Sequence, residues 1–213
     1  MDQARGAKLL SDKHFSVDGT LIQALWASMK RFRPWVGSGS GTGPGRNSER
    51  DFHGEKRSND THASETDPEA RLYRNSRGQG AQLCYQSHIL MENRNGQIVD
   101  HEHTPASGTG ERSTAAVDMV TRLPRNHRVT VGADRGYDTA DFIDDLRCRN
   151  ATPHVARNAK NRRSAIDGRT MRHLGYIASQ RIRRRIKEAF GWGKMSGPLR
   201  QVTVRRVAKI NHL

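Results

Sequence analysis

Short apolar segments of strand length alternate with segments of helical periodicity along this chain, and this alternation constrains the fold more than any other feature. Strand-like patterns cover residues 14–22, 81–92, 97–104, 129–133 and 152–156. Helical spacing of apolar residues covers 111–123, 139–149 and 177–192. Strands that alternate with helices in this way build a mixed sheet with helices on its faces. We therefore predict an α/β domain.

Other segments fall outside this alternation. Residues 1–13 are polar, and we expect an N-terminal remnant that precedes a domain covering 14–210. Residues 24–32 suit a short helix or irregular chain. Glycine, serine and other polar residues dominate 33–70, which predicts a flexible, disordered insertion. Residues 157–175 are basic and are expected to be irregular.

The charge of the chain indicates a polyanionic partner. Thirty-seven Lys and Arg oppose 22 Asp and Glu, which gives a net charge of +15. Sixteen of the basic residues lie between 157 and 209, where only Asp167 and Glu188 oppose them. Such a tract favours nucleic acid, and no apolar stretch long enough for a membrane segment competes with that interpretation. The residues that we expect to bind DNA are Arg162, Arg163, Arg181, Arg183, Arg184, Arg185, Lys187 and Lys194.

Three acidic residues are candidates for metal ligation. Asp18 and Asp134 each follow an apolar strand pattern and precede a glycine by one or two positions, and Glu188 lies on the basic helix. Carboxylates that converge from strand ends and a helix can hold two divalent metals, which suits phosphoryl transfer on nucleic acid. The alternatives are turn-forming aspartates before glycine and, for Glu188, a solvated ion pair with Arg184.

At these residues the chain resembles bacterial insertion-sequence transposases of the DDE type, which have a catalytic domain of the RNase H-like fold. The combination of matching segments is specific, although each alone is weak. Together these segments extend over most of residues 11–209. They are Phe15–Ile22, Asp51–His62, Thr66–Arg74, Leu90–Gly96, Val131–Asp138, Arg162–Thr170 and the helix Gln180–Lys194.

The resemblance implies DNA cleavage and strand transfer, with two Mg²⁺ (or Mn²⁺) ions between the carboxylates. It makes Asp18 the first ligand, Asp134 the second and Glu188 the candidate third. It implies DNA as the partner, both element ends and target, and we expect a homodimer and a location on the nucleoid in the bacterial cytoplasm. The alternative is a DNA-binding remnant that does not cut and that acts through the basic tract.

The chain departs from the family pattern at the third acid. Relatives carry an acidic residue three positions before the Phe of Phe-Gly-Trp, and here that position is Lys187, with Glu188 next to it. One residue of a helix turns the side chain by about 100°, which is too much for metal ligation without adjustment. Relatives also carry a helical N-terminal domain and a last apolar helix that this sequence lacks. We therefore expect a truncated copy whose cleavage activity depends on position 187.

Overall fold

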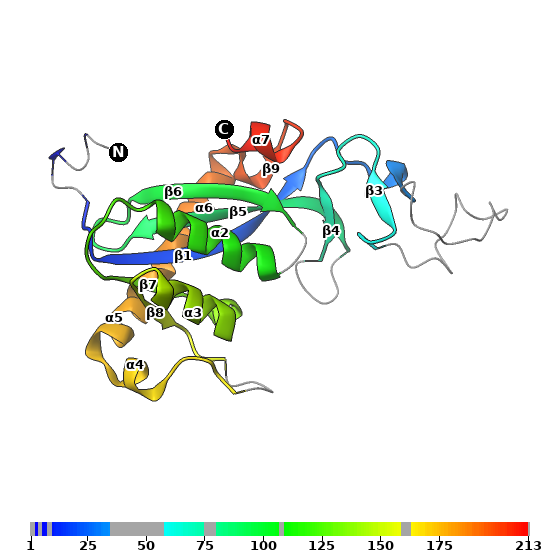
Figure 1. Cartoon of the computed structure of the whole chain (residues 1–213). Helices are drawn as coiled ribbons and strands as arrows, with labels where there is room; N and C mark the ends of the chain where they lie inside the picture. Colours follow the sequence, from blue (N-terminus) through cyan, green and yellow to red (C-terminus); the bar gives the residue numbers. More distant parts are fainter. Residues whose placement is uncertain are drawn as a thin grey trace.

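The computed structural model of the 213-residue chain describes residues 3, 6–7, 10–34, 58–74, 80–106, 109–158 and 163–212. Its centre is a sheet of mixed strand direction (Figure 1). The long strands β1 (His14–Ala24) and β5 (Gln82–Glu92) pair antiparallel, and β6 (Ile98–Pro105) continues the antiparallel side. On the other edge of β1, β7 (Val129–Ala133) and then β8 (Ala151–Val155) are parallel to it. The prediction of a mixed sheet is confirmed.

Short strands complete both sides of this sheet. β4 (Arg71–Tyr73) pairs with the beginning of β5, and β9 (Gln201–Val202) pairs with the end of β1. β7 and β9 contact the same strand at opposite ends, because β7 pairs with residues 14–16 and β9 with residues 23–24. The middle of β1 therefore has β5 on one edge, while its other edge lies between these two short ladders.

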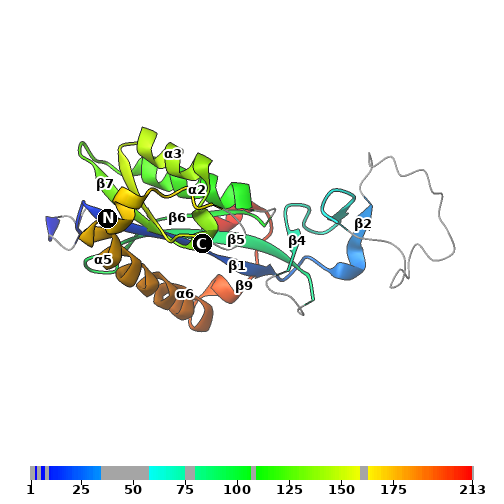
Figure 2. The ribbon, with the colours of Figure 1, turned by 90° about the horizontal axis from the view of Figure 1, so that it is seen from below.

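Helices cover both faces of the sheet (Figure 2). On one face lie α2 (Thr109–Arg122) and α3 (Ala140–Cys148), whose buried side chains pack with β1, β7 and β8 in the main hydrophobic core. On the other face lies α6 (Ile186–Met195), whose Ile186 and Phe190 pack on Ile89 and Met91 of β5. This is the predicted arrangement of a mixed sheet flanked by helices.

The basic helix is longer than predicted and contains a tighter turn. It begins as α5 (Leu174–Ile182), passes through the 3-10 turn η3 (Arg183–Arg185) and continues as α6, with right-handed helical backbone at both junctions. The preceding segment is not wholly irregular. It contains α4 (Gly168–Arg172), which begins where the side chain of Asp167 accepts the backbone N–H of Thr170, a helix N-cap interaction.

The prediction of a flexible insertion over 33–70 needs correction at both ends. After the 3-10 turn η1 (Met29–Arg31), β2 (Phe32–Pro34) pairs antiparallel with β3 (His62–Ser64). Asp67 is buried and accepts the Tyr85 hydroxyl at 2.6 Å. Polar composition misled the prediction here because some of these polar side chains are buried and hydrogen-bonded in the fold, as Asp67 is to Tyr85 of β5. Residues 35–57 of the predicted insertion lie outside the described residues.

Three more short elements are described. η2 (Arg135–Tyr137) follows β7, and its Tyr137 packs in the main hydrophobic core. η4 (Pro198–Arg200) and α7 (Val207–Ile210) flank β9 and close the end of the sheet next to β4. Ile210 and Val202 are buried with Ile22 and Tyr85 in a second hydrophobic cluster. The chain after α6 therefore returns to β1 and contributes to the core.

Candidate functional site

The pairing of β1 with β7 brings two of the predicted acids to one place. Ser16 lies opposite Gly132 in the parallel register, and two residues further along these strands are Asp18 and Asp134. Because side chains alternate between the faces of a strand, both acids lie on the face that carries Ser16 and Gly132. That face lies under the basic helix, since a Cβ placed on Gly132 would be 3.5 Å from the Cβ of Arg183.

Asp18 does not end its strand, contrary to the sequence-based expectation. It lies in the middle of β1, opposite Ile89 of β5, and is 9% exposed. The glycine that follows serves a close packing contact, because a Cβ on Gly19 would lie 2.9 Å from Nδ1 of the buried His88. The alternative of a turn at Asp18-Gly19 is wrong, because Gly19 continues the ladder as the partner of His88.

Asp134 lies where the prediction placed it, at the end of β7. It is partly buried and is the N-cap residue of η2, where its Oδ1 accepts the backbone N–H of Gly136 at 2.8 Å. The Asp18 Oδ1 similarly accepts the N–H of Gly19 at 2.8 Å. Both carboxylates thus have one oxygen held by the neighbouring backbone, which fixes their orientation.

The basic helix presents a row of cations to the same part of β1. Arg183 lies over Gly132, and Lys194 donates from Nζ to the Thr20 hydroxyl at 2.6 Å. Lys187 is four residues after Arg183 and seven before Lys194, so it lies on the same side of the helix. Thr20 shares its strand face with Asp18. Lys187, although exposed, therefore lies on the side of the helix that crosses β1 near Asp18.

Glu188 lies on a different side of the helix. It is exposed, and residues at helical spacing from it include the highly exposed Trp192 and Met195. Among the residues that the structure describes, no group of three or more His, Cys, Asp or Glu side chains could hold a metal ion. The structure brings Asp18 and Asp134 together without Glu188, so the described side chains do not provide the predicted three-carboxylate set for Mg²⁺. Glu188 lies away from the two aspartates because Ile186 and Phe190 are the residues of α6 that pack on the sheet. Their packing fixes the rotation of the helix about its axis and therefore the direction of Glu188.

The other predicted DNA-binding residues separate into groups. Arg181, Arg184 and Arg185 are exposed on the helix, and Arg163 is exposed beyond β8. Arg162 lies outside the described residues. Lys194 also lines a cavity of about 450 Å³ at the end of β1, together with Arg200, Tyr73 and several polar side chains. Two cations and an aromatic ring in one cavity suit a phosphate and a base of a nucleic acid. Arg200 was not among the residues predicted from the sequence to bind DNA.

Asp138, the last residue of the segment Val131–Asp138, has a structural role that the sequence did not indicate. It is buried, and its Oδ2 accepts the Asn158 backbone N–H and the Ser164 hydroxyl, each at 2.7 Å. Its Oδ1 accepts the Ala165 N–H at 2.9 Å. One carboxylate thus ties both ends of residues 158–165 to the chain just after Asp134.

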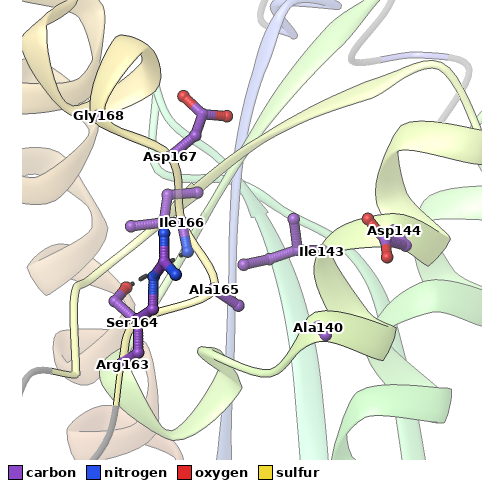
Figure 3. A pocket seen from close by; sticks show the side chains of 9 residues that line it. All are labelled: Ala140, Ile143, Asp144, Arg163, Ser164, Ala165, Ile166, Asp167 and Gly168. Carbon is purple, nitrogen blue, oxygen red and sulfur yellow. Dashed lines mark hydrogen bonds between the residues drawn. The ribbon is translucent and has the colours of Figure 1, made fainter.

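A second cavity, of about 460 Å³, lies between α3 and the segment 163–168 (Figure 3). Its lining includes Ile143, Asp144 and Asp167. Arg147 pairs with both aspartates, closely with Asp167 at 2.5 Å. The cavity is on the α3 side of the molecule, and neither Asp18 nor Asp134 lines it.

A buried histidine joins the helix to β8 on the face of the candidate site. The His154 Nδ1 and the Ser179 Oγ are 2.7 Å apart, and the ring packs edge-on against Tyr176. Burial, with smaller contributions from His173 and His14, lowers the pKa of His154 to about 4. Its alternation with apolar neighbours on β8 predicts a solvent-facing side chain, and it is buried because α5 covers this face of the sheet.

The sheet order, with three antiparallel strands followed by two parallel strands and helices on both faces, is that of an RNase H-like α/β domain. Two carboxylates on its central strands and a row of cations on the crossing helix lie on one face of this domain. The family described as "Transposase DDE domain" matches residues 11–192, so the chain belongs to this family. The predicted family is thereby confirmed. No curated protein matches the chain.

Solved structures with a distant likeness come from transposition and integration complexes. A Mos1 transposase paired-end complex with the left transposon end is 11% identical with a TM-score of 0.33 and covers 71% of this chain and 37% of its own. A simian T-cell lymphotropic virus intasome in complex with PP2A regulatory subunit B56 gamma is 11% identical with a TM-score of 0.35 over 96% and 56%. The Mos1 strand transfer complex is 11% identical with a TM-score of 0.33 over 90% and 49%. The chain thus spans about a third to just over half of the length of these chains.

None of the helices in the described part of the chain has the length and apolar character needed to cross a membrane.

Proposed function

We propose that this chain acts in DNA transposition and binds DNA across the face of β1 that carries Asp18 and Asp134. The DNA comprises the ends of an element and its target, and the place of action is the nucleoid of a bacterial cytoplasm. Membership of the transposase family supports the process. The row of Arg183, Lys187 and Lys194 supports the place, because these cations attract the phosphate backbone to the face that carries the two acids.

The observation that carries the proposal is the helical phase at Lys187. If the family's third acid corresponds to this position, a carboxylate there would approach Asp18 and Asp134, whereas Glu188 points away. A lysine supplies a positive charge where a divalent metal requires an oxygen ligand. We therefore propose that the chain binds DNA and that Lys187 blocks Mg²⁺- or Mn²⁺-dependent strand cleavage. Asp18 and Asp134 are the two ligands that remain.

The test is nicking of a supercoiled plasmid in Mg²⁺ or Mn²⁺ by the parent chain and by Lys187→Glu. We expect the parent to leave the plasmid intact and Lys187→Glu to nick it, because the variant supplies a third carboxylate on the side of the helix facing β1. The double variant Lys187→Glu/Asp134→Asn is the matched control and is expected to be silent. Nicking by the parent that is lost in Asp134→Asn would show that another side chain completes the site and would refute the role given to Lys187.

DNA binding is measured separately, by fluorescence anisotropy of a labelled duplex over a series of salt concentrations. The affinity should fall steeply with salt, because phosphate contacts release counterions. Lys194→Ala should weaken binding and make the salt dependence shallower by about one charge. The exposed Lys30→Ala, which is distant from the basic helix in sequence, is the comparison. Binding that ignores salt, or that is too weak to measure at low salt, would contradict the proposed function itself.

A further inference from the structure

The outer side of the α5–η3–α6 helix exposes apolar residues at both of its ends. Leu174 is 83% exposed, Ile177 57%, Trp192 71% and Met195 85%. These residues, with Arg181, Arg184 and Glu188 between them, follow one another at intervals of three or four positions, so they form one stripe about six turns long. We name this stripe the outer face. Four large apolar side chains in water on one helix mark an interaction surface.

The sequence of the outer face is self-complementary when the helix is reversed. A two-fold axis between Arg184 and Arg185 would place Leu174 opposite Met195 of a second copy and Ile177 opposite Trp192. It would also place Arg181 opposite Glu188, and each of these pairs would occur twice. A two-fold interface uses the same patch on both subunits, and the outer face meets this requirement at its apolar ends and in the Arg181–Glu188 pairs.

We infer that the outer face is the interface of a homodimer in which the two helices pack antiparallel. Apolar contacts at the two ends would supply most of the stabilisation, and the two Arg181–Glu188 pairs would fix the register and the direction, as flanking charges do in coiled coils. Near the two-fold axis, Arg184 of one copy lies opposite Arg185 of the other. These like charges are tolerated because the long side chains can keep their guanidinium groups in water at the rim of the interface. Glu188 makes no ion pair within the described part of the chain, so its charge is available for this contact.

This inference gives Arg181 and Glu188 a role different from DNA binding and metal ligation. It does not rest on the proposed function, because the interface lies on the side of the helix away from the sheet and its formation needs neither DNA nor metal. The residues of the stripe are exposed, and the ribbon of α6 lies at the edge of the molecule in Figure 2. A second copy could therefore approach without displacing the core helices α2 and α3.

The first test is a charge exchange followed by sedimentation equilibrium of the full chain without DNA. Glu188→Arg and Arg181→Glu should each weaken dimerisation at least tenfold, and the double variant should recover to within a few-fold of the parent. The two residues are about 11 Å apart along one helix, so recovery cannot come from a contact within one copy. Asp141→Arg, an exposed charge reversal on α3, is the control and should leave dimerisation unchanged.

Cross-linking tests the direction of packing. In a Cys148→Ser background, which removes the exposed native thiol, Leu174→Cys/Met195→Cys should form disulfide-linked dimers under mild oxidation. Either cysteine alone should not, because equivalent residues lie at opposite ends of an antiparallel pair. A parent that is monomeric at all concentrations would overturn the inference. So would a dimer that the charge exchange does not affect, or single-cysteine variants that cross-link as well as the double variant.

Discussion

Replacing Asp138 with alanine is expected to loosen the segment after β8 and to destabilise the whole domain. The Asp138 carboxylate is 1% exposed and accepts three hydrogen bonds, at 2.7, 2.7 and 2.9 Å, from residues 158, 164 and 165. A hydrogen bond to a charged group contributes about 1.5–3 kcal/mol, and a buried donor that loses its acceptor costs about 1–3 kcal/mol. The Ser164 hydroxyl can turn toward water, whereas the two backbone N–H groups are fixed. We therefore expect a loss of about 3–5 kcal/mol in the free energy of unfolding.

Urea unfolding followed by circular dichroism measures this loss, and limited proteolysis locates it. New cleavage should appear in the basic segment between β8 and α4, before cleavage elsewhere, because Asp138 holds both of its ends. Asp144→Ala is the matched control, since this exposed aspartate on α3 makes a 3.5 Å surface pair with Arg147. A loss below about 1 kcal/mol for Asp138→Ala, or cleavage no different from the control, would refute the reasoning.

Three further outcomes are expected. The pKa of His154 is about 4 in the folded chain and 6.5 in the unfolded chain, so the free energy of unfolding should fall by about 3 kcal/mol as the pH drops from 6.5 toward 4. In urea titrations at a series of pH values, His154→Gln should make the urea midpoint depend less on pH over this range. A pH dependence that the variant does not change would contradict burial of a neutral ring. Phe142→Ala removes a fully buried ring that packs on Tyr137, and it should lower the free energy of unfolding by about 3–5 kcal/mol in urea titrations. A loss under about 1 kcal/mol would mean that this part of the core is loosely packed. Arg122→Ala breaks two surface ion pairs with acids on β6, so thermal unfolding should show a loss of about 1 kcal/mol or less that shrinks further in high salt.

The strand and helix patterns came from local periodicity, and they were sufficient for the fold class. β1, β5, β7 and α3 begin and end within a few residues of the predicted limits. The short strands β3 and β4 were missed, because three-residue strands lack a periodic pattern and form only where a partner strand lies beside them. The Asp67–Tyr85 hydrogen bond shows why composition alone misjudged that part of the chain.

The candidate site shows the same division between local and long-range information. The sequence by itself determined the family, the α/β alternation, the basic tract and the choice of Asp18 and Asp134, because these depend on residue type and short spacing. Only the tertiary structure decided that the β1–β7 register places those two acids together, that Lys187 lies on the sheet side of its helix, and that Glu188 faces outward. The physical reason is that helical phase is set by which side chains, here Ile186 and Phe190, find a core to pack against. That core is built from strands about 100 residues away in sequence, so no local pattern could reveal it.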